Sequence, residues 1–173
     1  TDPPLVLKGA LLARTVYLTP ESRFRTDLDL LIQGEAVAGM EEQLRLLGYE
    51  RPVGAQSAMP LKQSQWSRRC DGRVFAIDLH WDLRNHPALQ DCFTFQELFE
   101  SAQPLTDLHE NALGMGPEYA LLNASMHYFN DYADERPLQG LLDKDLLWRS
   151  MSSDERTRAI ALACDRGLAG LLA

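Results

Sequence analysis

Two aspartates, Asp27 and Asp29, lie two residues apart in the otherwise apolar end of the segment 23–32. Alternate residues of a β-strand point to the same face of the sheet, so a strand here sets both carboxylates side by side. The aliphatic residues between and after them then face the opposite side. Burying two like charges is unfavourable unless a cation offsets them. The segment therefore predicts a strand that packs against the core on one face and binds a metal on the other.

A second strand, expected over residues 73–81, repeats this arrangement, because Asp78 and His80 share one face of it. Three strand-borne carboxylates are typical of sites for phosphoryl or nucleotidyl transfer, where two divalent ions about 3.5–4 Å apart assist the attacking and leaving oxygens. Hard oxygen ligands favour Mg²⁺ or Mn²⁺ over zinc. For His80 two interpretations stay open, a group beside the metal or substrate and a strand histidine bonded to a neighbouring carboxylate.

Phosphate binding is predicted at the start of the chain. Residues 5–9 indicate a short buried strand that ends at Gly9, and residues 10–17 indicate a helix. A glycine between a strand and a helix lets backbone N–H groups approach a phosphate. Lys8, Arg23 and Arg25 are the cations expected to neutralise phosphate charge there.

Length and charge limit the class of protein. A chain of 173 residues fits one ordinary domain, and no apolar run is long enough for a membrane span. The formal net charge of −8 argues against a nucleic-acid partner, which is held through many phosphates. Three cysteines without close spacing favour a reducing cytoplasm. The abrupt start at Thr1 favours a chain trimmed at one or both ends.

The pattern changes near residue 90. Residues 1–90 alternate strands and helices, including a helix over 37–47 that stops at Gly48. The segment 52–69 is predicted to be mostly loop, with room for one irregular strand. Residues 91–173 predict a helical subdomain packed on this core, with capping boxes at 94–97 and 152–155.

These features together resemble the DNA polymerase beta-type nucleotidyltransferase superfamily, and more narrowly a bacterial family of uncharacterised nucleotidyltransferases. The resemblance lies in short motifs spread over most of the chain. They are Leu7-Lys8-Gly9, Arg23 ahead of Asp27-Leu28-Asp29, Leu47-Gly48-Tyr49, Ile77-Asp78-Leu79-His80-Trp81, Met126-His127 and the run from Leu138 to Asp143.

The resemblance implies an α+β fold, with a small mixed sheet flanked by helices and a helical part that shapes the acceptor side. It implies that Asp27 and Asp29 bind both metals, and that Asp78 is a third ligand and helps to deprotonate an acceptor hydroxyl. The implied substrates are an NTP and a small-molecule or protein acceptor. The chain departs from the superfamily at Ala10, where a serine usually follows the glycine; Lys8 is expected to compensate in phosphate binding.

Three functions stay open at this point. The first is transfer of a nucleoside monophosphate to a hydroxyl with release of pyrophosphate. The second is a catalytically inactive nucleotide-binding or scaffold domain, which Ala10 favours. The third is a module regulated by a partner, such as a toxin or antitoxin component.

Overall fold

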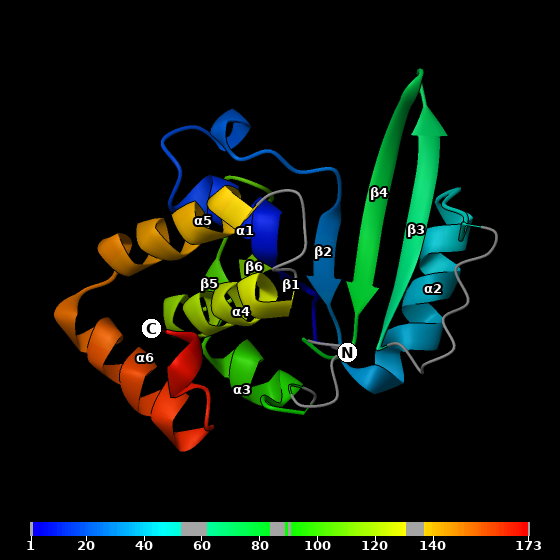
Figure 1. The fold of residues 1–173 in the computed structure, drawn as a ribbon. Helices are drawn as coiled ribbons and strands as arrows, with labels where there is room; N and C mark the ends of the chain where they lie inside the picture. The colour runs from blue at the N-terminus through cyan, green and yellow to red at the C-terminus, as the bar shows by residue number, and fades with distance from the viewer. Residues whose placement is uncertain (1, 53–61, 84–88, 90, 131–136, 173) are drawn as a thin grey trace.

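A computed structural model describes residues 2–52, 62–83, 89, 91–130 and 137–172. Its centre is one six-stranded sheet with the strand order β3-β4-β2-β1-β6-β5 (Figure 1). The strands are β1 (Leu5–Val6), β2 (Leu28–Leu31), β3 (Gln63–Cys70), β4 (Arg73–His80), β5 (Gln103–Pro104) and β6 (Leu113–Gly114). Because β2–β4 and β1–β6 are parallel pairs and the other three pairs are antiparallel, the sheet is mixed, as predicted.

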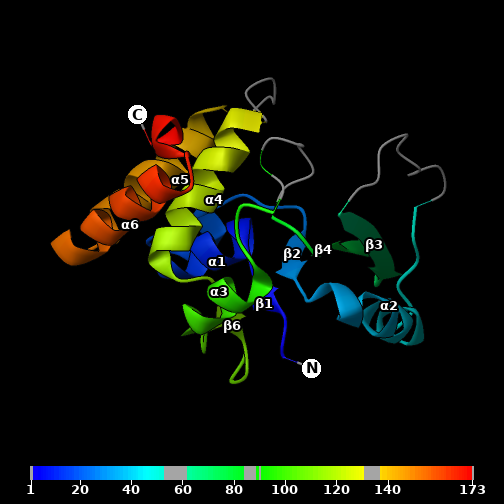
Figure 2. The same ribbon diagram turned by 90° about the horizontal axis from the view of Figure 1, so that it is seen from below.

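Helices cover different parts of this sheet. They are α1 (Lys8–Thr15), α2 (Val37–Leu46), α3 (Phe95–Glu100), α4 (Pro117–Asn130), α5 (Pro137–Ser150) and α6 (Ser153–Asp165), with short 3-10 turns η1 (Pro20–Ser22), η2 (Gly34–Ala36) and η4 (Ala169–Leu171). In both ribbon views α2 lies beside the β3–β4 hairpin, whereas α4, α5 and α6 gather on the far side of β1 and β2 (Figures 1 and 2). Within the described residues no helix combines the length and apolar character needed to cross a bilayer.

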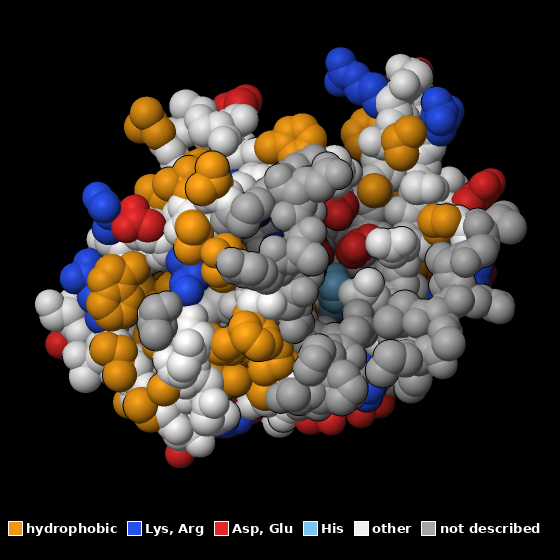
Figure 3. Space-filling view, viewed as in Figure 1, with side chains coloured by type: hydrophobic (Ala, Val, Ile, Leu, Met, Phe, Trp, Pro, Cys, Tyr) orange, Lys and Arg blue, Asp and Glu red, His pale blue; other side chains and the backbone are white. Residues whose placement is uncertain are grey.

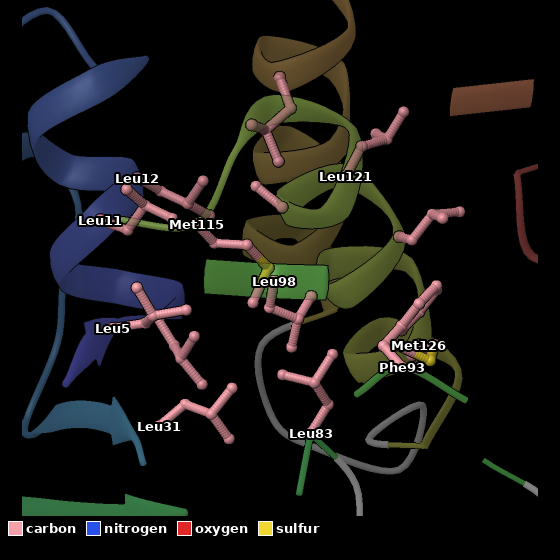
Figure 4. Close-up of a cluster of buried hydrophobic side chains, with 14 of the residues drawn as sticks. Leu5, Leu11, Leu12, Leu31, Leu83, Phe93, Leu98, Met115, Leu121 and Met126 are labelled. Carbon is pink, nitrogen blue, oxygen red and sulfur yellow. The ribbon is translucent and has the colours of Figure 1, made fainter. Parts of the chain in front are cut away.

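Two apolar clusters hold these layers together. The larger joins the sheet to α1 and the later helices: Leu5, Leu11, Leu98 and Met126 are each at most 4% exposed (Figure 4). The smaller lies between the sheet and α2, around Trp66. Since the larger cluster takes residues from both halves of the chain, burial of apolar surface stabilises the two halves together.

Several predicted elements are confirmed. Strand β4 covers the segment predicted as the second carboxylate strand, and α2 ends before Gly48, whose φ of +80° suits a glycine after a helix. Both capping boxes form, with Thr94 and Ser152 accepting from the backbone N–H groups of Glu97 and Glu155.

Other elements differ from the prediction. The segment expected to be mostly loop, with room for one irregular strand, contains the regular strand β3, although residues 53–61 of that segment lie outside the described part. Its sequence lacks an apolar alternation, and pairing with β4 along its whole length supplies the missing signal. The first helix begins at Lys8 rather than at residue 10.

The second half also contributes to the sheet, which the sequence did not indicate. Strands β5 and β6 are only two residues each, and β6 is held by parallel pairing with β1. Such short strands carry no periodicity that can be recognised in a sequence. The division at residue 90 stays a prediction, and three long helices do follow it.

The start of α4 depends on a close backbone approach at Gly116. A Cβ at this position would lie 2.6 Å from the carbonyl oxygen of Ser101. Gly116→Ala is therefore expected to lower the free energy of unfolding by about 1–3 kcal/mol, because backbone atoms must move. Urea denaturation measures this difference.

Gly39→Ala is the matched control. Gly39 lies inside α2, and a Cβ there would meet nothing within 4 Å. Alanine is the better helix former, so this variant should gain about 0.5–1 kcal/mol. Equal stability of the Gly116→Ala variant and the wild type would show that the approach to Ser101 is relaxed at no cost.

Candidate active site

The predicted carboxylates meet at the neighbouring parallel strands β2 and β4. Asp29 pairs in register with Asp78, and Asp27 lies just before β2. Ligand atoms of Asp29, Asp78 and His80 lie within 4.8 Å of one another. In the space-filling view, acidic side chains and a histidine gather in a hollow between the helical part and the β3–β4 hairpin (Figure 3). Strands β2 and β4 thus bring Asp29, Asp78 and His80 to one place, whereas Asp27, which was expected within the strand, lies in the bend that precedes it.

Asp29 is the buried centre of the group, with 5% of the residue exposed. Its Oδ1 accepts from Lys8 Nζ at 2.6 Å and lies 2.9 Å from His80 Nε2. Burial opposes ionisation of Asp29, but the bond to His80 and the charge of Lys8 outweigh it and lower its pKa to about 2. Asp29 is therefore a carboxylate whose charge is compensated within the protein.

Asp27 and Asp78 lie in a different electrostatic environment. Burial, together with the charges of neighbouring aspartates, raises the pKa of both carboxyl groups, and Lys8 offsets this only partly. Gln65 Nε2 lies 3.5 Å from Asp78 Oδ2. Half-buried carboxylates that repel one another are the donor set that a hard divalent cation would stabilise, so these residues fit Mg²⁺ or Mn²⁺.

Gly9 lies in the first turn of α1, against the loop that leads to β2. A Cβ at Gly9 would stand 3.3 Å from Arg25 Cβ and 3.5 Å from Arg23 Nη1. The glycine thus lets this loop pack closely on the helix. Ala10, the next residue, is 5% exposed and belongs to the larger apolar cluster.

The two arginines predicted to bind phosphate make contacts within the protein. Arg23 donates to both carboxylate oxygens of Asp143, from Nη2 at 2.7 Å and from Nε at 2.8 Å, and its Nη1 donates to the carbonyl of Phe24. Arg25 Nη1 donates to the carbonyl of Pro20 at 2.9 Å. Phosphate binding by either arginine stays a prediction, as does phosphate binding by His80, whose ring bonds to Asp29.

Asp143 is a residue whose role the sequence did not predict. It lies on α5, is 5% exposed, and also accepts from the Tyr17 hydroxyl at 2.7 Å. Burial, and then the bond to Asp143, raises the pKa of Tyr17. The buried ion pair connects the helical part to the loop before β2 and thus helps to place Asp27. A lone acid beside leucines in the run 138–143 was the only signal in the sequence.

Parallel carboxylate strands, a helix beginning at Lys8-Gly9 and a helical second half together define a protein of the nucleotidyltransferase fold. Residues 2–172 match the model of the family described as uncharacterised nucleotidyltransferase, and the chain belongs to this family. No curated protein matches the chain.

Two solved structures show the same fold. One is the antibiotic-resistance factor ANT(2'')-Ia, with a TM-score of 0.58 and 16% identity over 96% of this chain and 84% of that one. The other is an antigenic nucleotidyltransferase-like protein from Paracoccidioides brasiliensis, with a TM-score of 0.52 and 14% identity over 98% of this chain and 84% of that one. At these identities the likeness concerns the fold alone.

Proposed function

We propose that this protein transfers a nucleoside monophosphate from an NTP to a hydroxyl of a small molecule or protein and releases pyrophosphate. The observation that carries the proposal is the in-register pairing of Asp29 with Asp78 on parallel strands, beside the half-buried Asp27. Three carboxylates with a single contacting lysine leave net negative charge, which suits the binding of a metal–nucleotide complex.

Each residue then has a defined task. Asp27, Asp29 and Asp78 would hold Mg²⁺ or Mn²⁺, which when bound supplies Lewis acidity toward the phosphate oxygens. Asp78, the carboxylate of β4, would accept the proton of the acceptor hydroxyl. The acceptor oxygen forms a bond to the α-phosphorus as the bond to the pyrophosphate oxygen breaks. The first N–H groups of α1, at Lys8 and Gly9, face the phosphates.

The second candidate is a domain that binds a nucleotide without turnover. Ala10 favours it, because its methyl group is buried in the core and offers no hydroxyl to a terminal phosphate. We assign either activity to the cytoplasm, which the three free thiols Cys70, Cys92 and Cys164 favour.

Position-specific labelling distinguishes the candidates. With Mg²⁺ and fractions of acceptor from a bacterial extract, an α-phosphate label should appear on an acceptor while a γ-phosphate label leaves as pyrophosphate. Asp78→Asn should lower this transfer by roughly 10³-fold. Transfer of the γ-label in its place would mean phosphoryl transfer, and transfer that is unaffected in Asp78→Asn would remove the proposed site.

A further inference from the structure

Lys8 adopts a backbone conformation that is unusual for its residue type. Its φ is +43°, in the left-handed region, at the first residue of α1. Side chains with a Cβ seldom adopt this conformation, and where they do the surrounding structure holds them in it. The other non-glycine residues with positive φ in the described part are Asp71 and Asp91, and both lie outside helices and strands.

In this conformation the side chain of Lys8 reaches the carboxylate of Asp29. Its ammonium lies 2.6 Å from Asp29 Oδ1, and its side chain is 17% exposed. His80 Nε2 contacts the same oxygen at 2.9 Å. Oδ1 of the central carboxylate is therefore bonded to two nitrogen groups of the protein, and among residues 2–52, 62–83, 89, 91–130 and 137–172 none bonds to its Oδ2.

The charge of Lys8 also acts beyond Asp29. Its positive charge also opposes the rise in the pKa of Asp27 and Asp78, because it favours the ionised form of each carboxyl group. A unit positive charge near three carboxylates partly neutralises their negative charge, as a second divalent ion would. Lys8 is one of only three lysines in the chain, the others being Lys62 and Lys144.

We propose that Lys8 is a built-in cation that takes the place of one of the two metal ions, so that the site binds a single divalent ion. This inference rests on the proposed function and differs from the two-metal expectation from the sequence. Asp27, Asp78 and Oδ2 of Asp29 then serve that one ion. The backbone conformation at Lys8 holds the ammonium at Oδ1 of Asp29.

The test counts ions directly. Mn²⁺ bound per chain is measured by electron paramagnetic resonance with a saturating α,β-methylene NTP analogue, which cannot be turned over. Wild type should bind one Mn²⁺ per bound analogue. Lys8→Met should bind two and show dipolar broadening between the ions, because the ammonium no longer competes for the carboxylates.

Two further variants are controls for this ion count. Lys8→Arg keeps a cation and should bind one ion. Arg149→Met removes a positive charge from an exposed pair with Asp145 on α5 and should also bind one. If Lys8→Met does not fold, the counts for wild type and Lys8→Gln, which keeps a donor to Asp29 without the charge, carry the test.

Three results of these binding measurements would overturn the proposal for Lys8. Two ions in wild type would overturn the role of Lys8 and leave the proposed function standing. One ion in both Lys8→Met and Lys8→Gln would also overturn it, since the ammonium then excludes nothing. No binding of the analogue by wild type, with or without Mn²⁺, would overturn the proposed function and this inference together.

Discussion

Replacing Asp29 by Asn should lower the free energy of unfolding by about 3 kcal/mol in the absence of metal. The reason is that Lys8 and His80 both contact this buried carboxylate and lose its charge. Replacing Asp27 should have the opposite sign, with no loss or a gain of up to about 1 kcal/mol, because like-charge repulsion is relieved. Both variants should lose roughly 10³-fold in nucleotidyl transfer.

Urea denaturation in a chelating buffer measures the two stabilities. Asp145→Asn is the control, since it removes an acid that is 48% exposed and paired only on the surface of α5. It should change the free energy by less than about 0.5 kcal/mol. If Asp27→Asn and Asp29→Asn were equally destabilised, the charge of Asp29 would not be compensated by Lys8 as described.

Asp143→Ala, a change outside the carboxylate cluster, is also expected to have a large effect. The substitution removes the carboxylate that accepts a bidentate pair of hydrogen bonds from Arg23 and one hydrogen bond from the Tyr17 hydroxyl. It leaves the largely buried guanidinium of Arg23 without its carboxylate partner. The loss of stability should be about 3–5 kcal/mol. Because this pair anchors the loop before Asp27, nucleotidyl transfer by the folded variant should fall as well.

A double-mutant cycle isolates this interaction. Arg23→Met and Asp143→Leu are measured singly and together, and the double variant should regain much of what each single variant loses. The exposed pair Arg149 and Asp145, on the same helix, is the control cycle, with an expected coupling below about 1 kcal/mol. Additive losses at Arg23 and Asp143 would contradict a coupled pair.

The shared face of Asp78 and His80 could be predicted from the sequence, because a period of two fixes which residues of one strand point the same way. The pairing of Asp29 with Asp78 depends on the order of the strands in the sheet, which only the family resemblance implied. The environment of Arg23 could not be predicted, since its partner Asp143 lies 120 residues away and no local pattern connects them. For the same reason Arg23 looked available for phosphate.

Local strain and weak patterns account for the other differences. The left-handed backbone at Lys8 has no signature in the sequence, so its ammonium was expected at a phosphate rather than at Asp29. Strand β3 alternates Gln63, Gln65 and Ser67 with buried Ser64 and Trp66, and only its pairing with β4 makes this pattern a strand.

The most direct measurement of the central claim is thermal unfolding with each NTP, with and without Mg²⁺ or Mn²⁺. Wild type should be stabilised by one NTP only when the metal is present, by about 5–10 °C at 100 times the dissociation constant. Asp27→Asn/Asp78→Asn, which relieves repulsion and should fold, is predicted to lose this shift, while Asp145→Asn/Asp165→Asn keeps it. A shift that needs no metal, or one that survives in Asp27→Asn/Asp78→Asn, would contradict metal-dependent nucleotide binding at these aspartates.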